Sequence, residues 1–145
     1  GNSFVLVDML HKNKLIDIVR KKVLDGMPYI GWSAGANVAC PTIKTTNDMP
    51  IIEPISMAGF NLVPFQINPH YTEARLPNHA GETRVQRIEE FIVLNRDMPV
   101  VGLPEGCMLR IEGEDIKVIG QGEVKLFKYG NNTVVYRERD LISIN

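Results

Sequence analysis

The chain has 145 residues, of which 44% are hydrophobic and 23% charged, and a formal net charge of −1; this is the length and balance of one soluble globular domain. Such a charge offers no basic surface for nucleic acid or for a membrane anchor, and no apolar run approaches the ~20 residues of a membrane-spanning helix. Cys40 and Cys107 are the only cysteines, and without metal-site spacing they are interpreted as two buried thiols in a reducing compartment.

The first half of the chain is predicted to open with two helices, at residues 3–13 and 14–26. The second has apolar residues at helical spacing and Gly26 as its stop signal. The elements expected next are a buried strand at 27–32, a helix at 33–40, a polar loop at 42–50 and a strand at 61–67.

The second half is predicted to change from alternating elements to a β-rich tail. The expected elements are a loop at 71–81, a helix at 82–95, a strand at 98–106 and hairpin-forming runs at 110–120, 123–130 and 132–144. Strands that alternate with helices favour a largely parallel α/β sheet with an antiparallel appendage. A single α/β domain is expected over residues 1–145.

Three residues with side chains of nucleophile, base and acid type each follow a predicted strand: Ser33, His70 and Glu105. Ligands bind at the carboxyl ends of strands in open α/β sheets, so these residues are expected along one edge. The other histidines, His11 in helical sequence and His79 in a loop, are interpreted as surface residues.

Ser33 stands within a Gly31-x-Ser33-x-Gly35 pattern. This pattern is typical of a nucleophile elbow, a tight strand-to-helix turn that needs small flanking residues. The N–H of Ala34 could then donate to an oxyanion. The same pattern also occurs by chance as a packing corner, and both interpretations stay open at this point.

A serine–histidine pair needs a carboxylate to orient the imidazole. Glu105 leaves a predicted strand between Pro104 and Gly106 and is the favoured orienting residue. Asp48 is the other candidate, either as a residue that binds substrate or supports the site, or simply as a turn residue. The reverse assignment of these two acids also stays open.

Three long stretches carry a family resemblance: "YIGWSAGANVACPTIKTTNDMPI", "FQINPHYTEARLPNHAGETRVQRI" and "VVGLPEG". They resemble the peptidase E, or α-aspartyl dipeptidase, family of serine peptidases, which is related to the cyanophycinases. The resemblance runs from Gly1 to about Gly106 and more weakly through the tail. It implies an open, mostly parallel, doubly wound sheet of the flavodoxin-like or class I glutamine amidotransferase-like kind, with a β-rich C-terminal tail.

The resemblance also implies roles for individual residues. Ser33 would be the nucleophile, His70 the general base and Glu105 the third member of the triad. Asp48 matches an acidic residue that belongs to the catalytic set or binds the substrate's amino group.

Two further residues are assigned around the substrate. Arg84, at the start of a predicted helix, could bind the substrate carboxylate; without the resemblance it would be interpreted as an exposed helix residue. The resemblance implies that Gly1 is what remains of a glycine-rich turn that gives the family its second oxyanion donor. The chain is therefore expected to be N-terminally truncated relative to the family.

The function expected from the resemblance is hydrolysis of dipeptides with an N-terminal aspartate (Asp-X) through an acyl-enzyme. No cofactor and no metal are expected, and the partners would be a small peptide substrate, with no nucleic acid and no membrane. A cytoplasmic monomer or homodimer is expected. The alternatives are a cyanophycinase-like peptidase and a non-catalytic binding remnant; a glutamine-amidotransferase-like hydrolase is set aside because Ser33 stands where it needs cysteine.

Overall fold

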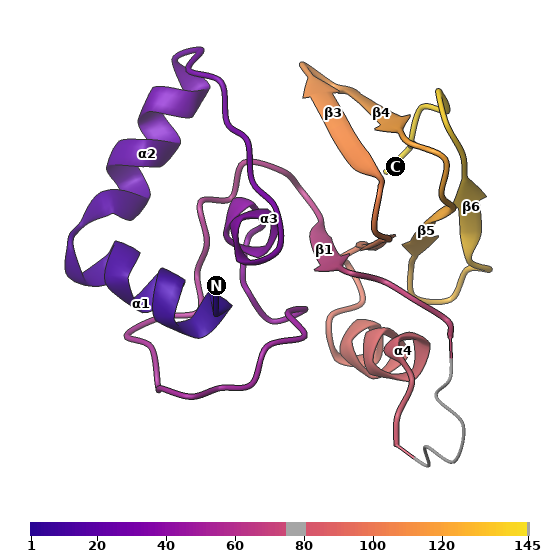
Figure 1. Ribbon diagram of the computed structural model, residues 1–145, viewed down its shortest axis with the longest axis horizontal. Helices are drawn as coiled ribbons and strands as arrows, with labels where there is room; N and C mark the ends of the chain where they lie inside the picture. Colours follow the sequence, from indigo (N-terminus) through magenta and orange to yellow (C-terminus); the bar gives the residue numbers. More distant parts are fainter. Residues whose placement is uncertain (75–80, 145) are drawn as a thin grey trace. The chain divides into compact units, whose positions relative to one another are not determined.

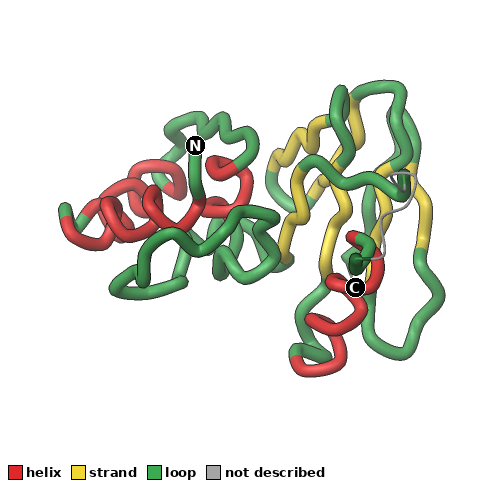
Figure 2. The backbone as a smooth tube through the Cα atoms, turned by 60° about the horizontal axis from the view of Figure 1, so that its bottom comes forward, coloured by secondary structure: helices red, strands yellow, loops and turns green. Residues whose placement is uncertain are grey.

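The computed structural model describes residues 1–74 and 81–144 (Figure 1). Its contacts divide the mixed α/β chain into two compact units, Gly1–Pro69 and His70–Asn145. Helices and loops make up most of the first unit, whereas the second combines a helix with several short strands and the loops between them (Figure 2). A single domain over the whole chain stays a prediction, and His79 lies outside the described residues.

The first unit opens with the two predicted helices, α1 (Ser3–Lys12) and α2 (Leu15–Leu24). Asn2 begins α1 as its N-cap, because its side-chain oxygen accepts hydrogen bonds from the N–H groups of Phe4 and Val5. A third short helix, α3 (Ala34–Ala39), confirms the helix predicted after the Gly-rich turn. The core of this unit consists of Phe4, Val7, Val38, Ile43 and Phe60.

The predicted strand at 27–32 is wrong, because this segment forms no strand. A strand needs a neighbour to pair its backbone, and no ladder to this segment forms within the described residues. Tyr29 packs its ring edge-on against Phe60 at 5.8 Å, whereas Ile30 and Trp32 are 84% and 79% exposed. The segment is thus anchored to the core on one side only.

The strand predicted at 61–67 is correct only at its end. Strand β1 runs from Gln66 to Pro69. Two features keep the preceding residues out of a strand: Asn61 has φ 51°, and Pro64 cannot donate to a ladder. All four residues of β1 are buried. His70, the residue directly after the strand, is exposed.

The second unit contains the predicted helix and the predicted antiparallel tail. Helix α4 (Arg84–Leu94) begins at Thr83, which forms a reciprocal capping box with Gln86. Strand β5 (Val124–Phe127) pairs antiparallel with β2 (Val100–Leu103) and with β6 (Val134–Tyr136). Strands β3 (Met108–Glu112) and β4 (Asp115–Ile119) form a separate hairpin.

One face of the β2–β5 pair builds the core of the second unit. Tyr71, Ile88, Ile92, Val100 and Phe127 form a single buried cluster. Val100 and Phe127 are directly paired across the strands, so their side chains share a face. Helix α4 contributes the two isoleucines, which lie four residues apart and therefore on one side of the helix. In the described part of the chain, no helix is long and apolar enough to span a membrane.

Candidate active site

Ser33 has the backbone conformation of a sharp turn into a helix. Its dihedral angles are φ 53° and ψ −119°, and α3 begins at the next residue. A non-glycine residue at positive φ is strained and persists only where its surroundings hold it. The Ser33 side chain makes no capping hydrogen bond to α3, so its hydroxyl is not committed to the helix. The turn and the helix start match what the Gly31-x-Ser33-x-Gly35 pattern predicts for an elbow, whereas the strand expected before the turn does not form.

The two glycines of this pattern are not equivalent. A Cβ on Gly31 would lie 2.5 Å from the carbonyl oxygen of Gly35, so no side chain fits there without a backbone shift. A Cβ on Gly35 would meet nothing closer than the Tyr29 hydroxyl at 3.8 Å, an ordinary contact. That hydroxyl donates to the Gly35 carbonyl oxygen at 2.6 Å. Close packing therefore explains Gly31, and Gly35 is not sterically required.

His70 and Glu105 form a pair within the second unit. His70 Nδ1 contacts Glu105 Oε1, with His70 directly after β1 and Glu105 two residues after β2. The His70 backbone also has a positive φ, 54°. Their side chains are 48% and 80% exposed, so solvent screens the attraction between them. Of the two candidate acids, Glu105 is the one that contacts His70. The third predicted residue, Ser33, belongs to the first unit.

Asp48 is tied to the start of α1. Its Oδ2 accepts hydrogen bonds from the Ser3 N–H at 2.6 Å and from the Ser3 hydroxyl at 2.7 Å. The Asp48 N–H in turn donates to the Thr46 hydroxyl. Partial burial raises the pKa of Asp48, but the hydrogen bonds from Ser3 and Thr46 outweigh burial, and the net pKa is lowered. A carboxylate at a helix N-terminus is also favoured by the helix dipole, so Asp48 has a structural role here.

The remaining predicted residues lie at chain or helix starts. Gly1 is exposed, directly before the N-cap of α1. Ala34 is the first residue of α3, where helix N–H groups lack intrahelical acceptors. Arg84 is the first residue of α4 and is half-buried; burial and the nearby Arg87 lower its pKa. Within the described residues, no carboxylate forms an ion pair with Arg84.

The two cysteines differ in their surroundings. Cys40 is fully buried and donates to the Ala36 carbonyl oxygen, and burial raises the pKa of its thiol to about 12. Cys107 is only half-buried, which corrects the expectation of two buried thiols, and its sulfur accepts from the Gly122 N–H. The Cys40 thiol stays protonated at neutral pH and is therefore a packing residue.

Sequence reasoning missed the partners that hold these residues. Ser3 contacts Asp48 across 45 positions of the chain. Tyr71, the residue after His70, donates its N–H to the Leu103 carbonyl oxygen. Helical or strand spacing gives no signal for pairs so far apart. The one local clue is that an aromatic residue, Tyr71, directly follows His70.

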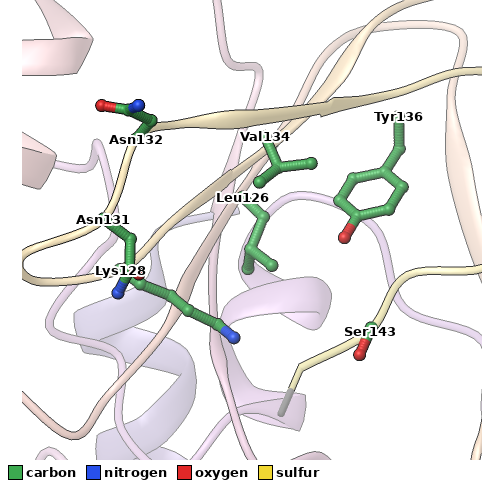
Figure 3. A pocket seen from close by; sticks show the side chains of 7 residues that line it. All are labelled: Leu126, Lys128, Asn131, Asn132, Val134, Tyr136 and Ser143. Atoms are coloured by element: carbon green, nitrogen blue, oxygen red, sulfur yellow. The ribbon is translucent and has the colours of Figure 1, made fainter.

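The second unit also has a shallow cavity of about 260 Å³. Its lining residues come from β5, β6, the turn between them and the C-terminal segment (Figure 3): Leu126, Lys128, Asn131, Asn132, Val134, Tyr136 and Ser143. None of the predicted catalytic or substrate-binding residues lines it. The cavity is therefore separate from the candidate active site.

A turn with a strained serine and a histidine–glutamate pair are features of a hydrolytic enzyme, and the relatives agree with this class. The chain belongs to peptidase family S51, whose pattern it matches over residues 1–119. It is 64% identical over 140 residues to peptidase E of Nostoc sp. (strain PCC 7120), covering 97% of this chain and 58% of that protein. It is 50% identical over 127 residues to peptidase E of Shewanella oneidensis, covering 88% of this chain and 54% of that protein.

A solved structure shows a similar fold. This is the 1.5 Å crystal structure of a peptidase E candidate from Listeria monocytogenes EGD-e, with a TM-score of 0.54 and 22% sequence identity. The match covers 94% of this chain and 56% of that one. The chain thus spans little more than half the length of these relatives.

Proposed function

We propose that this chain carries the catalytic residues of a serine-type dipeptidase that hydrolyses Asp-X dipeptides through an acyl-enzyme. The conformation of Ser33 is the observation that carries the proposal, because a strained serine with an uncommitted hydroxyl at a helix start is what nucleophilic catalysis needs. Membership of peptidase family S51 and the similarity to proteins named peptidase E support the reaction class.

In the proposed reaction, His70 acts as the general base. Its Nε2 takes the proton from Ser33 Oγ while Oγ attacks the peptide carbonyl carbon. Glu105, in contact with Nδ1, would keep the ring proton on Nδ1 and leave Nε2 free to accept. The N–H of Ala34 and the Gly1 region would stabilise the oxyanion.

The tetrahedral intermediate collapses when the peptide C–N bond breaks and His70 gives its proton to the leaving amine. The product is an ester between Ser33 and the aspartyl carbonyl. Water then attacks this ester and His70 accepts the proton of the water. The ester C–O bond breaks as His70 passes that proton to Ser33 Oγ, which restores the hydroxyl and releases the aspartate product. In these steps each proton passes between side chains, substrate and water, and no cofactor takes part.

Two charged residues would select the N-terminal aspartate. Asp48 Oδ1 would bind the substrate ammonium, because both bonds from Ser3 end on Oδ2. Arg84 would bind the side-chain carboxylate in a bidentate pair; its guanidinium has no competing carboxylate among the described residues. The proposal also includes an open, mostly parallel, doubly wound sheet and a cytoplasmic monomer or homodimer.

Hydrolysis of Asp-Leu, Glu-Leu and Ala-Leu by the wild type and by Ser33→Ala tests this proposal. Aspartate-selective cleavage that disappears in Ser33→Ala but persists in the control Ser143→Ala would support it. Cleavage of a β-aspartyl-arginine dipeptide instead would favour the cyanophycinase-like alternative. Circular dichroism and thermal melting establish folding, and absence of turnover from a cooperatively folded sample would favour the binding remnant.

A further inference from the structure

Tyr71 follows the exposed His70 directly, yet it is one of the most firmly held residues of the second unit. Its side chain is 5% exposed and packs against Phe127, with ring centroids 5.8 Å apart. Its N–H donates to the Leu103 carbonyl oxygen at 3.0 Å. Leu103 ends β2 and lies two residues before Glu105. One residue therefore links the backbone of the proposed base to the strand that carries its acid.

The tyrosine ring lies against a gap in β2 that glycine creates. A Cβ on Gly102 would meet the Tyr71 ring at 2.8 Å, so the ring takes the space that any larger residue would fill. Lys125 of β5 is directly opposite Gly102 in the strand register, and paired residues of neighbouring strands share a face. The Tyr71 ring and the Lys125 side chain therefore occupy the same face of the β2–β5 pair.

Tyr71 also belongs to a network of hydrogen bonds with Glu73 and Lys125. The Tyr71 hydroxyl donates to Glu73 Oε1 at 2.9 Å, and Lys125 Nζ donates to the same oxygen at 2.7 Å. The Lys125 side chain is only 16% exposed, whereas that of Glu73 is 52% exposed. The hydrogen bonds from Lys125 and Tyr71 lower the pKa of Glu73, and burial with the Glu73 bond raises that of Tyr71. Hydrogen bonds thus join the Glu73 carboxylate to both the Lys125 ammonium and the Tyr71 phenol.

From these contacts we propose that Tyr71, Glu73 and Lys125 position His70 against Glu105. They act through the backbone and do not touch the reacting atoms. His70 has a strained φ of 54°, and such a conformation persists only when adjacent contacts fix it. The Tyr71 ring, its N–H and its hydroxyl fix the residue after His70, while Leu103 fixes the start of the turn to Glu105. The inference rests on the proposed role of His70 as general base.

The test uses Tyr71→Phe, which keeps the ring, and Lys125→Met, which keeps the length of the side chain. Lys125→Arg keeps the cation and should rescue the effect, and Ile116→Val in β4 is the control for a buried change elsewhere in the unit. The first measurement is the tautomer of the His70 ring at alkaline pH, read from ¹H–¹⁵N correlations and assigned by their loss in His70→Gln. It needs no activity.

In the wild type and in Lys125→Arg, we expect the Nδ1–H tautomer that Glu105 stabilises. In Tyr71→Phe and Lys125→Met, the Nε2–H tautomer should gain population. The second measurement is Asp-Leu hydrolysis, in which the same two variants should lower kcat about tenfold and change KM less than about twofold. This split is expected of a misplaced base with an intact substrate site.

The two measurements separate the inference from the proposed function. If the wild type hydrolyses nothing, the dipeptidase proposal fails, and the tautomer populations still decide whether the network positions His70. If both variants keep the wild-type tautomer and match Ile116→Val in kcat, the positioning role is refuted. A loss in Lys125→Arg equal to that in Lys125→Met would refute the part assigned to the cation.

Discussion

Replacing Gly31 with alanine tests whether close packing creates the conformation of the Ser33 turn. The new Cβ would lie 2.5 Å from the Gly35 carbonyl oxygen, 2.7 Å from its carbon and 2.8 Å from the Tyr29 ring. Because two of these atoms belong to the backbone, the turn itself must move. Overpacking of this kind costs about 1–3 kcal/mol, and losing the bond from Tyr29 to Gly35 adds about 1 kcal/mol. We expect Gly31→Ala to lower the free energy of unfolding by about 2–4 kcal/mol.

The assay is urea unfolding followed by far-UV circular dichroism, which reports the loss of the helices. With a urea dependence of about 1.5 kcal/mol/M, the midpoint should fall by about 1.3–2.7 M. Gly35→Ala is the matched control, because its Cβ has room and alanine favours a helix over glycine by up to about 1 kcal/mol. Equal losses in both variants, or a midpoint within about 0.3 M of the wild type for Gly31→Ala, would refute the steric argument.

Three further predictions concern the ends and the surface of the two units. Asp48→Asn should lower the free energy of unfolding at neutral pH by about 1–2 kcal/mol. Folding lowers the pKa of Asp48 below its ordinary 3.8, so this difference from the wild type should shrink as the pH falls below about 4. Urea titrations from neutral to acid pH would measure the trend. Thr83→Ala removes the capping box of α4 and should cost about 1 kcal/mol by thermal unfolding, whereas Thr133→Ala at an exposed position should cost nothing measurable. Trp32, 79% exposed, should emit like free tryptophan in water and be quenched by iodide; a blue-shifted, protected emission would show that the segment 27–32 is covered.

Local signals predicted the helices and hairpins but not the long-range partners. Helix α2, for example, follows from apolar residues at helical spacing and from Gly26 as a stop signal, all of which lie within a few residues of one another. The tail hairpins likewise follow from short β-rich runs between turns. The segment 27–32 has the composition of a strand, yet pairing depends on a neighbour that local composition cannot supply.

The candidate site divides in the same way. The Gly31-x-Ser33-x-Gly35 pattern predicted a tight turn, and Ser33 has the matching dihedral angles. The sequence favoured Glu105 over Asp48 as the orienting acid but left the reverse open, because the contact from His70 to Glu105 spans 35 positions and that from Ser3 to Asp48 spans 45. Only folding brings such residues into contact. The sequence therefore offered two candidate acids and a preference for Glu105, and the contact of each acid is known only from the folded structure.

The strained backbones of Ser33 and His70 connect these results. Within the described residues, positive φ occurs at five non-glycine positions, and the proposed nucleophile and the proposed base are two of them. Near Ser33, Gly31 has no side chain, and the Gly35 backbone packs closely against it. Next to His70, the buried ring of Tyr71 packs closely against Gly102. In both cases a glycine lets other atoms approach closely, and that approach holds the neighbouring residue in a conformation it would not adopt alone. Each side chain that we propose to be reactive is thereby placed on a backbone that packing holds, so neighbours that never touch a substrate are expected to control its geometry.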